Sequence, residues 1–144
     1  MSRLLPALAA AAATLSLTAC AYGPRDAQRD ALTPEQSAEL AKLVEGKVAQ
    51  EPINCLPPGL RSASNVRMSD NVLAYRQGRG TVYVNNLRSS CPGLARDWDI
   101  IVSEQLQGRP CNGDIIRLVD RTSGMFGGSC VLGEFTPYKD AGEG

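Results

Sequence analysis

Four cysteines beyond residue 50 limit the possible folds of this chain more than any other feature. They stand at intervals of 36, 20 and 19 residues, so no pair has the close spacing of a zinc site or a redox-active pair. In an oxidising compartment, an even set of cysteines forms structural disulfides. If the chain is exported, we therefore expect no metal ion and two disulfides among Cys55, Cys91, Cys111 and Cys130.

The first nineteen residues have the pattern of a signal peptide. Arg3 supplies a short positive start, and residues 4–17 form an uncharged run rich in Leu and Ala. This run is too short to span a bilayer as a mature anchor. We therefore expect export, which provides the oxidising conditions that disulfides need.

Cys20 follows two small residues, and the group resembles the lipobox of bacterial lipoproteins. The resemblance implies cleavage before Cys20 and a diacylglycerol on its sulfur. An ordinary secretory peptide cut near Ala19 is the alternative. Ala21 stands where the inner-membrane retention signal of many lipoproteins has Asp. The resemblance therefore implies an outer-membrane lipoprotein that faces the periplasm, held in the membrane by its acyl chains.

Charge and composition argue against several functions. The chain carries 15 basic and 15 acidic residues, and loss of Arg3 with the signal peptide leaves a net charge of about −1. Such a balance gives no general attraction for nucleic acid. The chain has no histidine, which removes the usual general base, the commonest metal ligand and any Ser-His-Asp arrangement. We expect no enzymatic activity, no cofactor and no nucleic-acid partner.

The chain beyond the signal peptide has the length of one domain. Residues 20–32 are polar, contain a Gly-Pro pair and show no sustained period, so we expect a flexible tether. Thr33, Pro34 and Gln36 form a capping box with proline at the first helical position. A helix over 34–49 should follow, because apolar residues then recur at helical spacing, at Leu40, Leu43, Val44 and Val48.

After Cys55 the apolar period changes from about 3.6 to about 2, which predicts strands. Glycine-containing turns separate them, and residues 122–129 are expected to form a glycine-rich loop. Short strands without interleaved helices favour a small antiparallel barrel or sandwich of about six strands, filling a single domain over 33–140 with the helix. The expected strands are 60–68, 72–76, 81–87, 100–106, 115–119 and 130–136.

Three spaced motifs resemble those of a family of small exported, cysteine-containing proteins of Gram-negative bacteria, many of them lipoproteins. The motifs are Cys91-Pro92-Gly93-Leu94, Cys111-Asn112-Gly113-Asp114 and the run from Cys130 to Phe135. The resemblance covers roughly residues 55–138. It implies a shared disulfide-bonded domain and carries over no catalytic residues, because the family has no assigned function.

Few residues have the pattern of a chemical site. Asp97, Asp99 and Glu104 are close in sequence and could form a carboxylate pair, but solvated turn residues are the simpler interpretation. The glycines of 124–128 lack the Lys-Ser/Thr of a phosphate loop. Trp98, the single tryptophan, should fill the core over the Cys91 loop, and an exposed ligand-binding aromatic is the alternative.

Arginines are concentrated in one part of the chain, between residues 61 and 88, with Asp70 as the one acidic residue there. They could form a surface for an anionic ligand, because guanidinium groups bind phosphate and carboxylate in two-pronged hydrogen bonds. Alternatively, the acidic stretch 97–120 neutralises them. The candidate residues are Arg61, Arg67, Arg76, Arg79 and Arg88.

These observations predict a non-catalytic binding or structural lipoprotein of the cell envelope, whose partner is an envelope protein or an anionic envelope polymer. One alternative is an inhibitor of an envelope-attacking hydrolase, by analogy with lysozyme-inhibitor lipoproteins of similar size. A histidine-free hydrolase is another. An enzyme needs a deep pocket, an inhibitor a protruding loop and a scaffold a broad flat patch.

Three disulfide pairings are possible, and an assumed up-and-down meander selects one of them. In a meander, the turn at 107–113 lies at the same end of the sheet as residue 60, and the loops at 88–98 and 120–129 lie at the other end. A bridge requires Cα atoms within about 7 Å, so it cannot join opposite ends. The expected pairs are Cys55 with Cys111 and Cys91 with Cys130.

Overall fold

The computed structural model describes residues 32–60, 65–78 and 80–142. The predicted signal peptide, most of the tether, Cys20, Arg61 and Arg79 lie outside the described residues. The described part is mainly β, with one helix, two antiparallel sheets and two disulfides, as predicted. The elements are α2 (Pro34–Leu43), β1 (Lys47–Ala49), β2 (Asn65–Arg67), β3 (Val72–Gln77), β4 (Thr81–Asn86), β5 (Asp99–Glu104), β6 (Ile115–Asp120), β7 (Phe126–Val131) and β8 (Phe135–Asp140).

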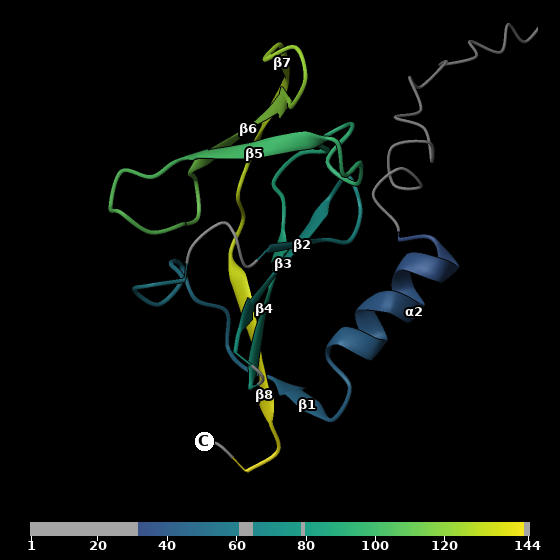
Figure 1. Cartoon of the computed structure of the whole chain (residues 1–144). Coiled ribbons are helices and arrows are strands. Elements are labelled where there is room, and N and C mark those ends of the chain that lie inside the picture. Colours follow the sequence, from purple (N-terminus) through teal and green to yellow (C-terminus); the bar gives the residue numbers. More distant parts are fainter. Residues whose placement is uncertain (1–31, 61–64, 79, 143–144) are drawn as a thin grey trace, which may run out of the picture.

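The helix and the two sheets form three layers (Figure 1). One sheet has the order β1-β8-β4-β3-β2 and the other has the order β5-β6-β7, and neither closes into a barrel. Helix α2 packs on one face of the five-stranded sheet. The three-stranded sheet packs on the opposite face, with β5 running across the direction of β3, β4 and β8.

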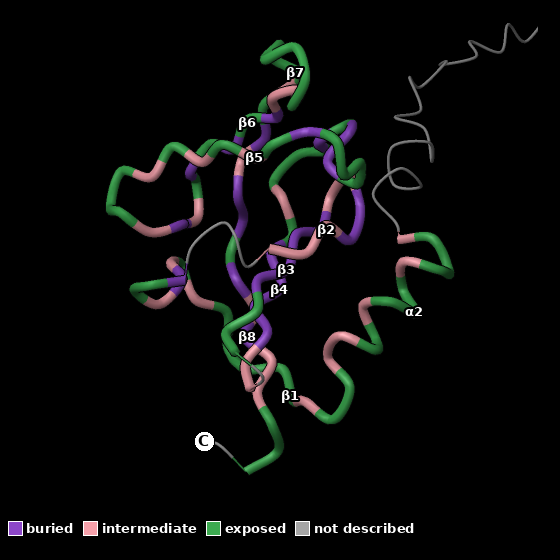
Figure 2. Tube along the Cα trace, in the orientation of Figure 1, coloured by how far each residue is buried: buried purple, intermediate pink, exposed green. Residues whose placement is uncertain are grey.

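Each interface between layers has its own apolar core. Strands β3 and β4 supply both cores, because successive side chains of a strand point to opposite faces. Leu73 and Tyr75 face Ile116 and Leu118 of β6, and the Tyr75 ring meets Phe135 edge to face at 5.7 Å. Residues of the other parity in β3 and β4 lie beneath α2. Figure 2 shows the resulting contrast between buried β3 and β4 and the more exposed β5 and β7.

Helix α2 begins as predicted but ends early. The Thr33 hydroxyl accepts a hydrogen bond from the Gln36 amide, and the Gln36 side chain accepts one from the Thr33 amide. The helix ends at Leu43 rather than at residue 49, because Gly46 adopts a left-handed conformation (φ 72°) that reverses the chain. Val48 therefore belongs to β1, where it pairs with Lys139 of β8.

The hairpin of β3 and β4 confirms the prediction for residues 72–87. Its strands pair from Val72 with Asn86 to Gln77 with Thr81. The strand predicted over 60–68 is shorter, because the described pairing is limited to Asn65–Arg67, and residues 61–64 lie outside the described residues.

The glycine-rich loop predicted over 122–129 is wrong, because β7 begins at Phe126. The strand predicted over 130–136 is also wrong: the chain leaves β7 after Val131 and enters the other sheet as β8 at Phe135. Buried Asn85 stabilises this crossing, because its side chain donates to the Gly133 carbonyl at 2.7 Å and accepts from the Gly133 amide at 3.1 Å. Gly133 is required here, since a Cβ would clash with the backbone oxygen of Asn86.

The disulfides join Cys55 to Cys111 and Cys91 to Cys130, the pairs that we expected. The meander used to select them is nevertheless wrong, because β8 inserts between β1 and β4. Cys130 pairs with Ile116 near the start of β6, so it lies at the same end of that strand as Cys111. The expected pairs therefore form for a different geometric reason: both bridges fasten loops around the start of β6.

Candidate functional site

The exposed side of the three-stranded sheet carries apolar side chains from all three strands. We call this side, with Ile100, Val102, Ile115, Val119 and Phe126, the outer face. Ile100 is 45% exposed, Val102 44%, Ile115 40% and Phe126 62%. The register places Ile100 opposite Val119, and Val119 opposite Phe126, so these three side chains form a row across the sheet.

Trp98 extends this outer face beyond the start of β5. It is 59% exposed, so the prediction that it fills the core is wrong. Strand alternation explains the difference, because Trp98 shares the parity of Ile100 and Val102, and Leu94 is the buried side chain of the Cys91 loop. The guanidinium carbon of Arg96 lies 5.6 Å from the centre of the Trp98 ring, a cation–π arrangement.

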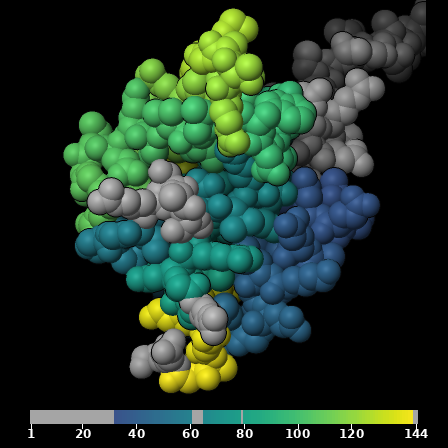
Figure 3. Space-filling view, viewed as in Figure 1, coloured from purple at the N-terminus to yellow at the C-terminus, as the bar shows by residue number. Residues whose placement is uncertain are grey.

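The hairpin between β6 and β7 carries Met125 and Phe126, which are 69% and 62% exposed. Figure 3 shows this hairpin rising above the neighbouring surface. The Asp120 carboxylate orders its turn by accepting hydrogen bonds from the Ser123 amide, the Ser123 hydroxyl and the Thr122 amide. The bonds to Ser123 are the main cause that holds the pKa of Asp120 below its usual value.

The three carboxylates considered as possible acid–base groups lie in different environments. Asp97 is exposed in the loop before β5, and Asp99 is buried. Glu104 has the opposite strand parity to Asp99 and forms a 2.7 Å ion pair with Arg117 on the outer side of the sheet. The structure therefore places Asp99 and Glu104 on opposite faces of β5, where they do not share a proton.

Two of the candidate arginines contact the protein itself. Arg67 donates to the backbone oxygen of Arg96 and, at 2.5 Å, to that of Asp99, linking β2 to the start of β5. Arg88 donates from Nε and Nη2 to the Asn112 side-chain oxygen at 3.1 and 2.8 Å. These contacts brace one layer or loop against another.

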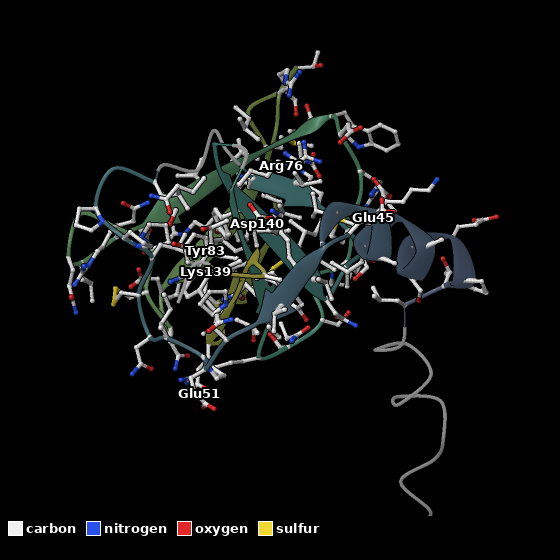
Figure 4. The ribbon with its side chains drawn as sticks, turned by 90° about the horizontal axis from the view of Figure 1, so that it is seen from below. Glu45, Glu51, Arg76, Tyr83, Lys139 and Asp140 are labelled. Carbon is white, nitrogen blue, oxygen red and sulfur yellow. A yellow bond between two sulfur atoms is a disulfide. The ribbon has the colours of Figure 1, made fainter. Side chains whose placement is uncertain are left out.

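Arg76, labelled in Figure 4, is the residue before the last of β3 and pairs there with Val82 of β4. Arg67 is at the opposite end of the β2–β3 ladder. Because Arg61 and Arg79 lie outside the described residues, a shared anionic-ligand surface stays a prediction.

The hollows of the described surface are open. One of them, of about 530 Å³, has a mostly charged lining: Glu39, Asn65, Val66, Arg67, Asp97 and Arg121. Within the described ranges, no group of three or more acidic or cysteine side chains is arranged to hold a metal ion. The described helix, α2, has ten residues and falls short of the length that crossing a membrane requires.

Residues 1–141 match a known protein family. The chain belongs to the DUF6491 family. This is a family of unknown function, so the prediction that the chain comes from an uncharacterised family is confirmed. No curated protein matches the chain. No solved structure matches it either.

Sequence reasoning missed most of the outer face of this DUF6491 domain. Residues 100–102 are all apolar, so the sequence does not show which side of the strand is buried. Phe126 was assigned to a loop because glycines surround it. Trp98, Ile100 and Val102 stand at alternate positions, so their side chains point to one side of the strand. This alternation is the signal for the outer face once the start of the strand is known.

Proposed function

We propose that this protein is a non-catalytic lipoprotein, anchored in the outer membrane through Cys20 and facing the periplasm, that acts by binding through its outer face. The observation that carries the proposal is the row of exposed apolar side chains on β5, β6 and β7. A contiguous apolar surface is unfavourable in water. On soluble proteins, such a surface marks a site of interaction with a partner or a membrane.

The arrangement of the carboxylates and arginines also supports binding rather than catalysis. Asp99 and Glu104 lie on opposite faces of β5. Arg67 and Arg88 donate hydrogen bonds to backbone and side-chain oxygens of the protein itself. The ion pair of Glu104 and Arg117 lies within the outer face beside Val102 and Ile115. A mixture of apolar side chains with a few polar groups is typical of protein interaction surfaces.

The anchor is tested by Cys20→Ser, which should release the protein from the membrane fraction because no sulfur remains for the lipid. Retention of this variant in the membrane would contradict the anchor. The variant should keep the melting temperature of the parent domain, since Cys20 takes no part in the two disulfides.

The outer face is tested by placing a photo-crosslinking amino acid at Val102 in living cells. The matched control places it at Lys139, on β8 of the other sheet. We expect adducts from position 102 and few from position 139. Equal yields at the two positions would contradict binding through the outer face. The mass of the adduct identifies the chemical class of the partner.

A second candidate function is supported by the projecting β6–β7 hairpin. An inhibitor of an envelope-attacking hydrolase inserts a protruding loop into the enzyme cleft, and Met125 and Phe126 are exposed on such a projection. The protein should then inhibit a peptidoglycan hydrolase in solution, and Phe126→Ser should abolish inhibition. A lack of inhibition across hydrolase classes removes this candidate.

A further inference from the structure

Aromatic and sulfur-containing side chains gather at the hairpin end of the outer face. The register places Phe126 two strands from Ile100, a backbone separation of about 10 Å. The Arg121 amide donates to the Trp98 carbonyl at 3.3 Å, which ties the start of the hairpin to Trp98. Met125 and Trp98 are both more than half exposed. We call Trp98, Ile100, Met125 and Phe126 the aromatic end.

The chemistry of the aromatic end suits the boundary between lipid tails and water. Tryptophan buries an apolar ring and keeps its N–H near polar groups, which is why it is enriched at that boundary. Arg96 lies over the Trp98 ring, and its long apolar stem lets the charge reach headgroups while the ring enters the apolar layer. The Asp120 carboxylate accepts hydrogen bonds from Ser123 within the hairpin turn and stays charged.

The described chain begins near an edge of the molecule that the loop before β5 and the start of the β6–β7 hairpin also reach. Leu32 packs into the core beneath α2, and Glu39 of α2 lines the same hollow as Asp97 and Arg121. Glu39 is six residues after Thr33, about 9 Å along the helix. The N-terminal start of the domain therefore lies near the loop and hairpin that carry the aromatic end.

A short tether brings this edge to the membrane. If residues 20–32 are the flexible tether that the sequence predicts, their mean span is about 20 Å and their maximum about 40 Å. A folded chain of this size has a radius of gyration of about 13 Å. The domain then stays within roughly its own diameter of the lipid, at an effective concentration in the millimolar range, so even a weak contact is populated.

We propose that the aromatic end lies against the lipid surface in which the protein is anchored, with Trp98 and Phe126 inserted at the headgroup level. This inference rests on the proposed anchor and names the surface that part of the outer face contacts. Arg96 and Arg121 are balanced by the two carboxylates of Asp97 and Asp120, so the contact depends mainly on apolar insertion and only weakly on salt. The short predicted tether, together with the place where the described chain begins, favours lipid over a protein partner at this end.

Trp98 is the single tryptophan and reports the contact directly. The experiment uses the chain from Cys20 onward, which contains every residue that the structure describes. Because the other four cysteines form disulfides, the Cys20 thiol can be coupled to a maleimide lipid in phosphatidylethanolamine–phosphatidylglycerol vesicles. We expect the Trp98 emission to shift to shorter wavelength and to be quenched at least twofold by lipids brominated near the headgroup.

The matched control moves the reporter. In the double variant Trp98→Phe, Leu106→Trp, the new tryptophan lies beyond the far end of β5, about 20 Å away, at a position that is 93% exposed. Its emission should be unchanged by brominated lipid. Phe126→Ser should at least halve the quenching of Trp98, and 0.5 M salt should change it little.

Equal quenching of the two reporters, or none at Trp98, would overturn the proposal. So would a blue shift of Trp98 that appears only when envelope proteins are added and is insensitive to brominated lipid, because it assigns the aromatic end to a protein. The coupling is made in vitro, so failure here is separate from failure of the anchor, which the fractionation of Cys20→Ser tests in cells.

Discussion

The two sheets use similar residues and reach opposite burial. In β3, four consecutive residues from Val72 to Tyr75 are buried, because α2 covers one face and the three-stranded sheet covers the other. In β5, Ile100 and Val102 are as apolar as the residues of β3 and remain exposed. The covering layers, rather than residue type, therefore decide which strand becomes core and which stays at the surface.

This contrast has an energetic meaning. Each buried apolar side chain of β3 contributes roughly 1.5–3 kcal/mol to stability, whereas the exposed side chains of the outer face leave most of that gain unrealised in the free protein. A contact that covers the outer face would recover part of it. The five-stranded sheet should therefore respond to substitution through stability, and the three-stranded sheet through binding.

The disulfide between Cys91 and Cys130 tests how far the two sheets fold as one unit. It joins the loop after β4 to β7, and its two cysteines are 39 positions apart in the sequence. Replacing both cysteines with alanine should lower the free energy of unfolding by roughly 4 kcal/mol, because the unfolded chain gains freedom. Chemical denaturation measures the change.

Cys20→Ala is the control for that measurement and should leave the denaturation midpoint unchanged. The double variant could lose only the structure of β5–β7, with β3 and β4 still protected from hydrogen exchange. The two sheets would then be separate cooperative units with different stabilities. A double variant as stable as the parent would contradict a structural role for the bridge.

The two phenylalanines form a matched pair across the contrast. Phe135 is fully buried against Tyr75, and Phe126 is 62% exposed on the outer face. Phe135→Ala should cost at least about 3 kcal/mol, because it removes a buried ring and leaves a cavity. Phe126→Ala should change stability by less than about 0.5 kcal/mol. If thermal unfolding shows similar losses of stability for the two variants, the two sheets do not differ in how strongly burial stabilises them.

Asn85 tests the junction at which the chain passes from one sheet to the other. Its buried side chain pairs with both the amide and the carbonyl of Gly133 and also donates to the Glu134 carbonyl at 3.2 Å. Asn85→Ala should cost about 2 kcal/mol, because buried backbone groups lose their partner. Urea denaturation measures this cost, and Asn86→Ala, at an exposed neighbour, is the control that should have little effect.

The smallest expected effect is a pH response confined to the exposed sheet. Hydrogen bonds from Ser123 and Thr122 hold the pKa of Asp120 below its ordinary value of 3.8. Their stabilisation is present above pH 3.8 and is lost as the pH falls through the lower folded-state pKa. Amide exchange of Thr122 and Ser123 should then accelerate, while β3 and β4 stay protected.

Asp120→Asn should remove that pH dependence, because the amide does not titrate in this range. If the amides of β3 and β4 lose protection together with those of Thr122 and Ser123, the hairpin is not an independent local unit. That result would weaken the distinction between the two sheets.

The predictions that succeeded depend on interactions between residues close in sequence. Thr33 and Gln36 cap α2 because the groups that bond are three residues apart. The β3–β4 hairpin is short, and its alternating side chains give the register. Strands β5 and β6 were also found from local pattern, within one or two residues of their ends.

Composition and local spacing were enough to predict the number of disulfides, the start of the helix and the β class. Tertiary structure decided the rest. The helix ends before Gly46, and residues 47–49 pair with β8 instead. The last predicted strand is divided between two sheets at the crossing that the Asn85 side chain stabilises. The aromatic end is outside for the same reason: whether Trp98 and Phe126 are buried depends on which layers cover the sheet, and layer packing joins residues far apart in the chain.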